Sequence, residues 1–182
     1  MSLLRFLGIG GSAPTDGKEG ATAGETATVR RIAAQLERLE PDLARYLAAF
    51  AYVLARVAHA DLHFAEEETA KMERIVAELT TLRPEEAALV VEIAKSQARL
   101  LGGTENYVVT REFRRIATRE QRVQLLECLF AVAVADGLIS GAESFEIACI
   151  AEELGFTRPE LNGLRARWRD QLSERAAPRK PA

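Results

Sequence analysis

The sequence predicts an all-α protein: a single helical domain of about seven helices, built from two related helix-turn-helix units with internal pseudo-two-fold symmetry. Apolar residues between Val29 and Trp168 recur at helical spacing, and no window alternates long enough to indicate a strand. A stretch of sequence also occurs twice along the chain. Aromatic residues make up only 6% of the sequence, so the core must be built from Leu, Ile, Val and many Ala. Small alanine side chains let helices approach closely, which favours an all-helical fold.

The repeat consists of two stretches, residues 58–85 and residues 133–160, that align without a gap. Ten of the 28 aligned positions are identical, where ordinary residue usage predicts roughly two or three. Each copy contains an aspartate followed seven residues later by a glutamate. A unit that recurs in this way indicates duplication, and the shared acids are the candidate chemistry.

Four helical segments are expected in the first half of the chain, at residues 29–39, 42–61, 69–79 and 84–101. Pro41 ends the first, because proline cannot continue a helix. Pro84 lies in the first turn of the fourth, and Glu85 and Glu86 follow at the positive end of that helix. Gly102 and Gly103 then stop it.

The second half begins with an expected loop at residues 102–109 and a short basic segment at 110–117. The helix over 123–135 is apolar on nearly every side, which is typical of a central helix, and residues 46–60 should lie beside it. Gly137 marks a turn. Helix-opening capping patterns occur at Thr118–Gln121, Ser140–Glu143 and Thr157–Glu160.

The chain divides into a flexible N-terminal segment and linker (1–28), a helical domain (29–174) and a disordered tail (175–182). The apolar residues 2–8 are expected to dock on the domain or to be disordered. No apolar run is long enough for a transmembrane segment. A formal net charge of −3 gives no electrostatic basis for binding nucleic acid. Cys128 and Cys149 are expected to be buried and reduced, which predicts a cytoplasmic location.

The two acidic pairs, Asp61 with Glu68 and Asp136 with Glu143, have two interpretations. In the structural one, each Asp accepts hydrogen bonds from its turn and each Glu closes a capping box. In the other, the four carboxylates are pooled in a site for a divalent cation: Ca²⁺, Mg²⁺, Mn²⁺ or Zn²⁺. The second copy has the spacing of the second half of an EF-hand loop, but apolar residues replace the acids of the first half, so an EF-hand is excluded.

The first copy adds two histidines at a spacing of four, His59 and His63, which share one face if the helix continues through them. With Asp61 and Glu67 they are additional candidate metal ligands; as histidines at a turn they need no ligand. Glu66–Glu68 and Glu152–Glu153 are expected on solvated helix faces. No motif for a catalytic nucleophile occurs, so no catalytic residue is assigned.

The second copy, with Ala133, Asp136, Gly137, Ile139 and Glu143 after an apolar helix, resembles the signature of the tellurite-resistance TerB-like family. The first copy resembles its other half, and the resemblance covers about residues 43–168. It implies an all-helical domain with acids at paired turns and a role in tellurite and other chemical stress. It also implies metal binding and complexes with other proteins near the inner membrane face. Leu62 departs from the signature, which has Gly there.

Three functions remain open at this stage. The first is a non-enzymatic TerB-like stress-response module that binds a divalent cation or presents an acidic patch to a partner protein. The second is a purely structural helical adaptor for protein–protein interaction, in which the Asp/Glu pairs are turn and helix caps. The third, metal-assisted hydrolysis by the carboxylates, has the least support because no activated nucleophile is visible. We expect Asp61 and Asp136 at the same end of the molecule.

Overall fold

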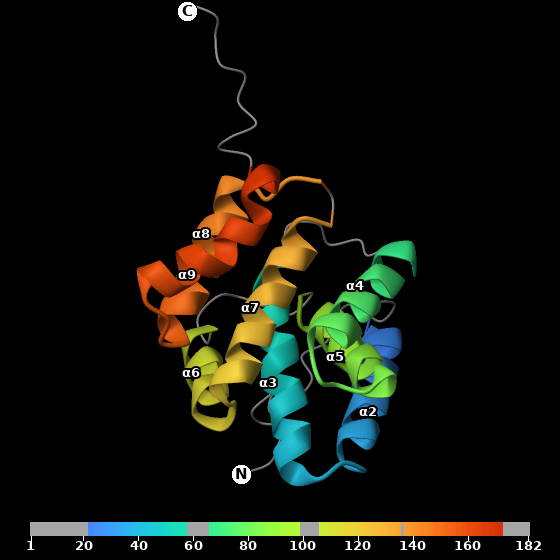
Figure 1. The fold of residues 1–182 in the computed structure, drawn as a ribbon. Helices are drawn as coiled ribbons and strands as arrows, with labels where there is room; N and C mark the ends of the chain where they lie inside the picture. The colour runs from blue at the N-terminus through green and yellow to red at the C-terminus, as the bar shows by residue number, and fades with distance from the viewer. Residues whose placement is uncertain (1–21, 58–65, 99–105, 136, 173–182) are drawn as a thin grey trace, which may run out of the picture.

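The computed structural model describes residues 22–57, 66–98, 106–135 and 137–172, and these residues form helices joined by short connections (Figure 1). They contain no strand, only an isolated backbone bridge between Ile139 and Leu172. The helices are α2 (Thr22–Leu36), α3 (Pro41–Val57), α4 (Glu66–Leu79), α5 (Pro84–Ala98), α6 (Asn106–Ile116), α7 (Arg119–Ala133), α8 (Gly141–Glu153), α9 (Arg158–Arg165) and the 3₁₀-helix η2 (Ala166–Gln171). The all-α prediction is therefore confirmed.

Helix α3 is the centre of the fold. It is buried along nearly its whole length, and it packs against α5, α6, α7 and α8. Alanines supply much of its buried surface, at positions 44, 48, 49, 51 and 55. A helix with so many small side chains leaves room for neighbours on several sides, which explains how four helices can share it.

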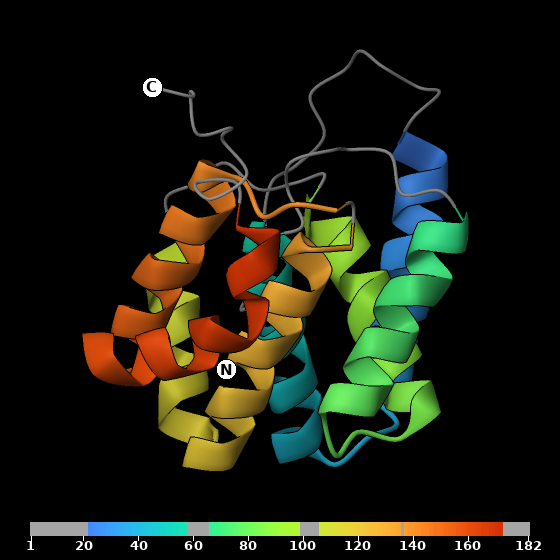
Figure 2. The same ribbon diagram turned by 45° about the horizontal axis from the view of Figure 1, so that its top comes forward.

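Helix α7, which the sequence placed at the centre, lies beside α3 as expected but is less enclosed. The two helices point the same way: both end at the upper end of the molecule, where α4 and α8 begin (Figures 1 and 2). Helix α4 packs against α7, whereas α8 packs against both α3 and α7. The four helix ends that flank the two repeated acidic pairs in the sequence therefore lie at one end of the domain.

The three predicted capping boxes are all present. In each, the side chain of the third helical residue accepts a hydrogen bond from the backbone N–H of the N-cap residue. These N–H···O distances are 2.8 Å for Thr118 to Gln121, 2.7 Å for Ser140 to Glu143 and 2.7 Å for Thr157 to Glu160. Local sequence therefore set the starts of α7, α8 and α9.

Helix α6 was missed by the sequence interpretation, and the described residues contain eight α-helices where about seven were expected. Residues 106–109, expected as loop, open α6 because its apolar stripe meets α3. Phe113 is fully buried there against Tyr46 and Phe50, with ring centroids 5.4 and 5.9 Å away. Helix α2 begins at Thr22, inside the segment assigned to a linker. The pseudo-two-fold symmetry stays a prediction, because α5 has 15 residues and its counterpart α9 only eight.

The C-terminal part of the domain covers α7. Trp168 in η2 stacks on Phe130 with ring centroids 6.4 Å apart, and Leu172 forms the backbone bridge to buried Ile139. No helix in the described ranges is long and apolar enough to cross a membrane.

Replacing Phe113 with alanine should destabilise the domain strongly, because it removes a fully buried ring from the junction of α3 and α6. We expect the free energy of unfolding to fall by about 3–5 kcal/mol. Phe145→Ala is the matched control: that ring is 70% exposed, and the change should stay within about 0.5 kcal/mol. Urea unfolding followed by the fluorescence of the single tryptophan measures both. Equal losses would contradict the assignment of Phe113 to the core.

Candidate functional site

The acidic end of the domain, defined by the ends of α3 and α7 and the starts of α4 and α8, is where the sequence placed its candidate ligands (Figures 1 and 2). Glu67 and Glu68 lie in the first turn of α4, and Glu143 lies in the first turn of α8. Asp61, Asp136, His59 and His63 lie outside the described residues. Within the described ranges, no three acidic, histidine or cysteine side chains gather closely enough to hold a metal ion.

The turn before α8 shows what Glu143 does locally. Gly137 has φ +117°, a backbone conformation that other residues rarely adopt. This explains why the second copy of the repeat has glycine at this position. Ser140 is the N-cap: its hydroxyl accepts from the Glu143 N–H at 3.2 Å, and one carboxylate oxygen of Glu143 accepts in return. The structural interpretation thus holds for this acid, and the capping bond occupies one of its two carboxylate oxygens.

A lysine joins the two turns. Lys71, in the second turn of α4, donates a hydrogen bond to the carbonyl oxygen of Ala135, just after the end of α7. This contact places the start of α4 against the end of α7. A positive group at a helix C-terminus also offsets the negative end of the helix dipole.

A buried charge network links α3, α6 and α8, and the sequence interpretation missed it. The guanidinium of Arg56 donates to Glu153 at 2.6 Å, to Glu146 at 2.8 Å and to the hydroxyl of Thr110 at 2.7 Å. The Arg56 side chain is only 4% exposed, against 17% for Glu153 and 31% for Glu146. Burial lowers the pKa of Arg56, but hydrogen bonds and attraction from the two carboxylates outweigh it and raise the pKa.

Glu153 therefore corrects the expectation that Glu152–Glu153 form a solvated face. One sequence signal could have found the network: Arg56 is the only charged residue in the otherwise apolar stretch from 46 to 58. An arginine that interrupts a buried helix needs acidic partners, because an unpaired buried charge is costly. The sequence does not reveal which acids those are, since they lie 90 and 97 residues further along the chain.

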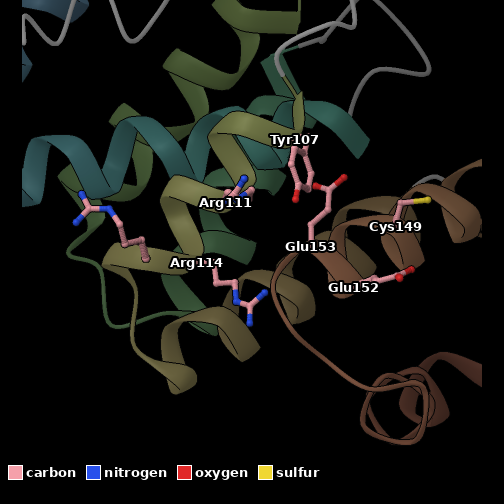
Figure 3. A pocket seen from close by; sticks show the side chains of 7 residues that line it. Tyr107, Arg111, Arg114, Cys149, Glu152 and Glu153 are labelled. Carbon is pink, nitrogen blue, oxygen red and sulfur yellow. The ribbon is translucent and has the colours of Figure 1, made fainter.

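An open groove of about 670 Å³ lies between α6 and α8, on the outer side of this network. Helix α6 lines it with Tyr107, Arg111, Arg114 and Arg115, and α8 lines it with Cys149, Glu152 and Glu153. Figure 3 shows Tyr107, Arg111 and Arg114 along one helix, and Glu153, Cys149 and Glu152 on the other. Glu153 thus lines the groove and also holds Arg56.

Both thiols are free, but only one is fully buried. Cys128 is enclosed in α7, and burial raises its pKa to about 12. Cys149 was also expected to be buried, yet it is partly exposed in the groove. Burial, with repulsion from Glu146 and Glu153, raises its pKa as well. Neither thiol is an activated nucleophile.

The Arg56 network predicts an asymmetry in stability. Glu146→Gln/Glu153→Gln keeps two hydrogen-bond acceptors but leaves a buried guanidinium without counter-charge, so we expect a loss of about 3–5 kcal/mol. Arg56→Met should cost less, because the two glutamates are partly exposed and can turn to water. The triple variant should recover part of the double variant's loss. Urea unfolding tests the order, and a larger loss for Arg56→Met would contradict it.

Cys149 should be the thiol that iodoacetamide modifies in the folded protein, while Cys128 reacts only after unfolding. Since the pKa of Cys149 is raised, its alkylation rate should still be rising with pH at pH 8.5, where an ordinary thiol begins to level off. Peptide mapping by mass spectrometry identifies the modified residue. A rate that levels off below pH 8.5 would contradict the raised pKa.

Comparison with known proteins addresses the family. No curated protein and no solved structure matches the chain significantly. Among models of protein families, the one described as tellurite resistance protein TerB matches residues 47–166, about two thirds of the chain. The matched range runs from α3 to the start of η2 and includes both repeated turns, the Arg56 network and the groove. The chain therefore belongs to the TerB tellurite-resistance family.

Proposed function

We propose that this TerB-family chain is a non-enzymatic stress-response module that binds a divalent cation at the acidic end of the domain. One observation supports the proposal: the described ends of α3 and α7 and the described starts of α4 and α8, which flank the two repeated acidic pairs in the sequence, lie at one end of the domain (Figure 1). The candidate ligands are Asp61, Glu68, Asp136 and Glu143. Carboxylates from two neighbouring turns could supply the oxygen ligands that one turn alone lacks.

The capping role of Glu143 is compatible with this function. A carboxylate has two oxygens with about four acceptor sites, and the cap uses one oxygen. Helix α7 shows that a neutral residue suffices for the cap, because Gln121 occupies the same position there. The charge of Glu143 is therefore available for a cation or for a basic partner surface.

The cation test is a thermal melt with Ca²⁺, Mg²⁺, Mn²⁺ or Zn²⁺ against NaCl of equal ionic strength. A ligand at a hundred times its Kd stabilises by about 2.7 kcal/mol, so we expect Tm to rise by roughly 5–10 °C. Glu143→Gln keeps the capping acceptor and should remove most of the rise. A shift specific to Zn²⁺ and lost in His63→Gln would instead assign the site to His59, His63 and Glu67.

Glu160→Gln is the matched control, because Glu160 closes the same capping box at α9. Helix α8 separates the two positions by about 20 Å at 1.5 Å per residue. This variant should keep the cation-dependent rise in Tm. If no cation raises Tm, or if both variants lose the rise equally, the metal site is wrong.

The second candidate function is a structural adaptor whose acids are caps, with other proteins as partners in the cytoplasm or at the inner membrane face. The observation in its favour is the complete capping box of Glu143. For an adaptor, no cation should change Tm, and Glu143→Gln, which keeps the capping acceptor, should have only a small effect on stability.

A further inference from the structure

The charges in the α6–α8 groove do not balance. Glu153 is engaged by Arg56, and Arg115 pairs with Glu112 on its own helix at 2.7 Å. Two arginines, Arg111 and Arg114, then face a single remaining acid of the lining, Glu152. Neither arginine forms an ion pair with an acid in the described part of the chain. The groove therefore carries a surplus of positive charge on a protein whose net charge is negative.

Both arginines are nonetheless held in place. The guanidinium of Arg111 lies over the ring of Tyr107, 5.3 Å from its centroid. The guanidinium of Arg114 lies against Gly155, so closely that a Cβ there would be 2.7 Å from it. Gly155 has φ +82° and comes immediately after Leu154, the C-cap of α8, where glycine is the usual residue. Ring and backbone contacts orient the two guanidinium groups without neutralising them.

Capping of α8 does not explain this surplus. Arg122 donates a hydrogen bond to the carbonyl oxygen of Leu154 at 2.9 Å, and Arg119 donates one to the carbonyl oxygen of Gly155 at 3.3 Å. Two other arginines therefore already bind the carbonyl groups at the end of α8. Burial lowers the pKa of Arg122, and repulsion from Arg119 and Arg114 adds to this. Arg114 thus adds positive charge to a helix end that is already compensated.

The two helices that form the groove also carry exposed apolar side chains. Tyr107 is 54% exposed and Val108 62%, both in the first turn of α6. Phe145 lies one turn before Cys149 on the same face of α8. Exposed aromatic residues beside oriented arginines are typical of the anchoring points of protein interfaces.

We propose that the α6–α8 groove binds an acidic segment of a partner protein. Carboxylates of that segment pair with the guanidinium groups of Arg111 and Arg114, which bind carboxylates in a two-pronged geometry. An apolar side chain of the segment covers Tyr107 and Val108. The volume of about 670 Å³ is far larger than one small oxyanion needs, and the apolar rim favours a peptide over a bare anion. This surface is separate from the acidic end, so the proposal stands whether or not a cation binds there.

The test uses the full chain and a fluorescein-labelled peptide in which pairs of glutamates alternate with leucine and phenylalanine. Its comparison peptide has glutamine at every glutamate. We expect fluorescence anisotropy to show binding of the acidic peptide that weakens with added NaCl. Arg111→Gln/Arg114→Gln should weaken the binding at least about tenfold.

Arg38→Gln/Arg74→Gln is the matched control, because it removes the same charge from two exposed positions outside the groove. It should change the affinity by less than about twofold. Equal weakening by the two double variants would mean that net charge alone drives binding, and would overturn the proposal.

Cys149 gives a second readout located inside the groove. The acidic peptide should slow its alkylation by iodoacetamide, and the glutamine peptide should not. Inorganic phosphate and phosphatidylserine vesicles are tested in parallel. Unchanged alkylation with bound peptide, or protection by phosphate or vesicles but not by peptide, would refute the proposed partner.

Discussion

The central helix α3 has alanine at many of its buried positions. Because these side chains are short, four neighbouring helices can pack closely against it. A helix buried on so many sides cannot bury unpaired polar side chains along its length without a cost in free energy. Its buried face therefore determines which helices can approach and how closely. Helix α6 follows from this constraint: Phe113 fills the space beside Tyr46 and Phe50, and the helix forms around that contact.

Arg56 is the exception that the core must accommodate. Its charge is buried near the end of α3, so partners have to come from other helices. Glu146 and Glu153 lie seven residues apart, two turns along one face of α8, and together they hold that helix against α3. The groove exists where this attachment meets α6. The need to pair the buried charge of Arg56 therefore also affects the groove, because the Glu153 side chain both binds Arg56 and lines the groove.

The domain carries opposite charges in separate places. Acids gather at the end where α4 and α8 start, and arginines gather along α6 and at the far end of α8. Helix dipoles favour both placements, since acids stabilise helix starts and bases stabilise helix ends. The same charged side chains thus stabilise the helix ends and set the charge of the two surfaces. Glu143 illustrates this, because its carboxylate closes a capping box and still carries a charge at the surface.

The sequence by itself determined the repeat, which is a comparison of the chain with itself. It also determined the all-α class, the three capping boxes and the turn at Gly137, because each of these depends on residues within a few positions of one another. It also led to the TerB family, which the matched range 47–166 confirmed. Only the tertiary structure decided that α6 is a helix, that α3 is the centre and that Arg56 binds Glu153. These features depend on contacts between segments far apart in the chain, and periodicity along one segment carries no information about its partner.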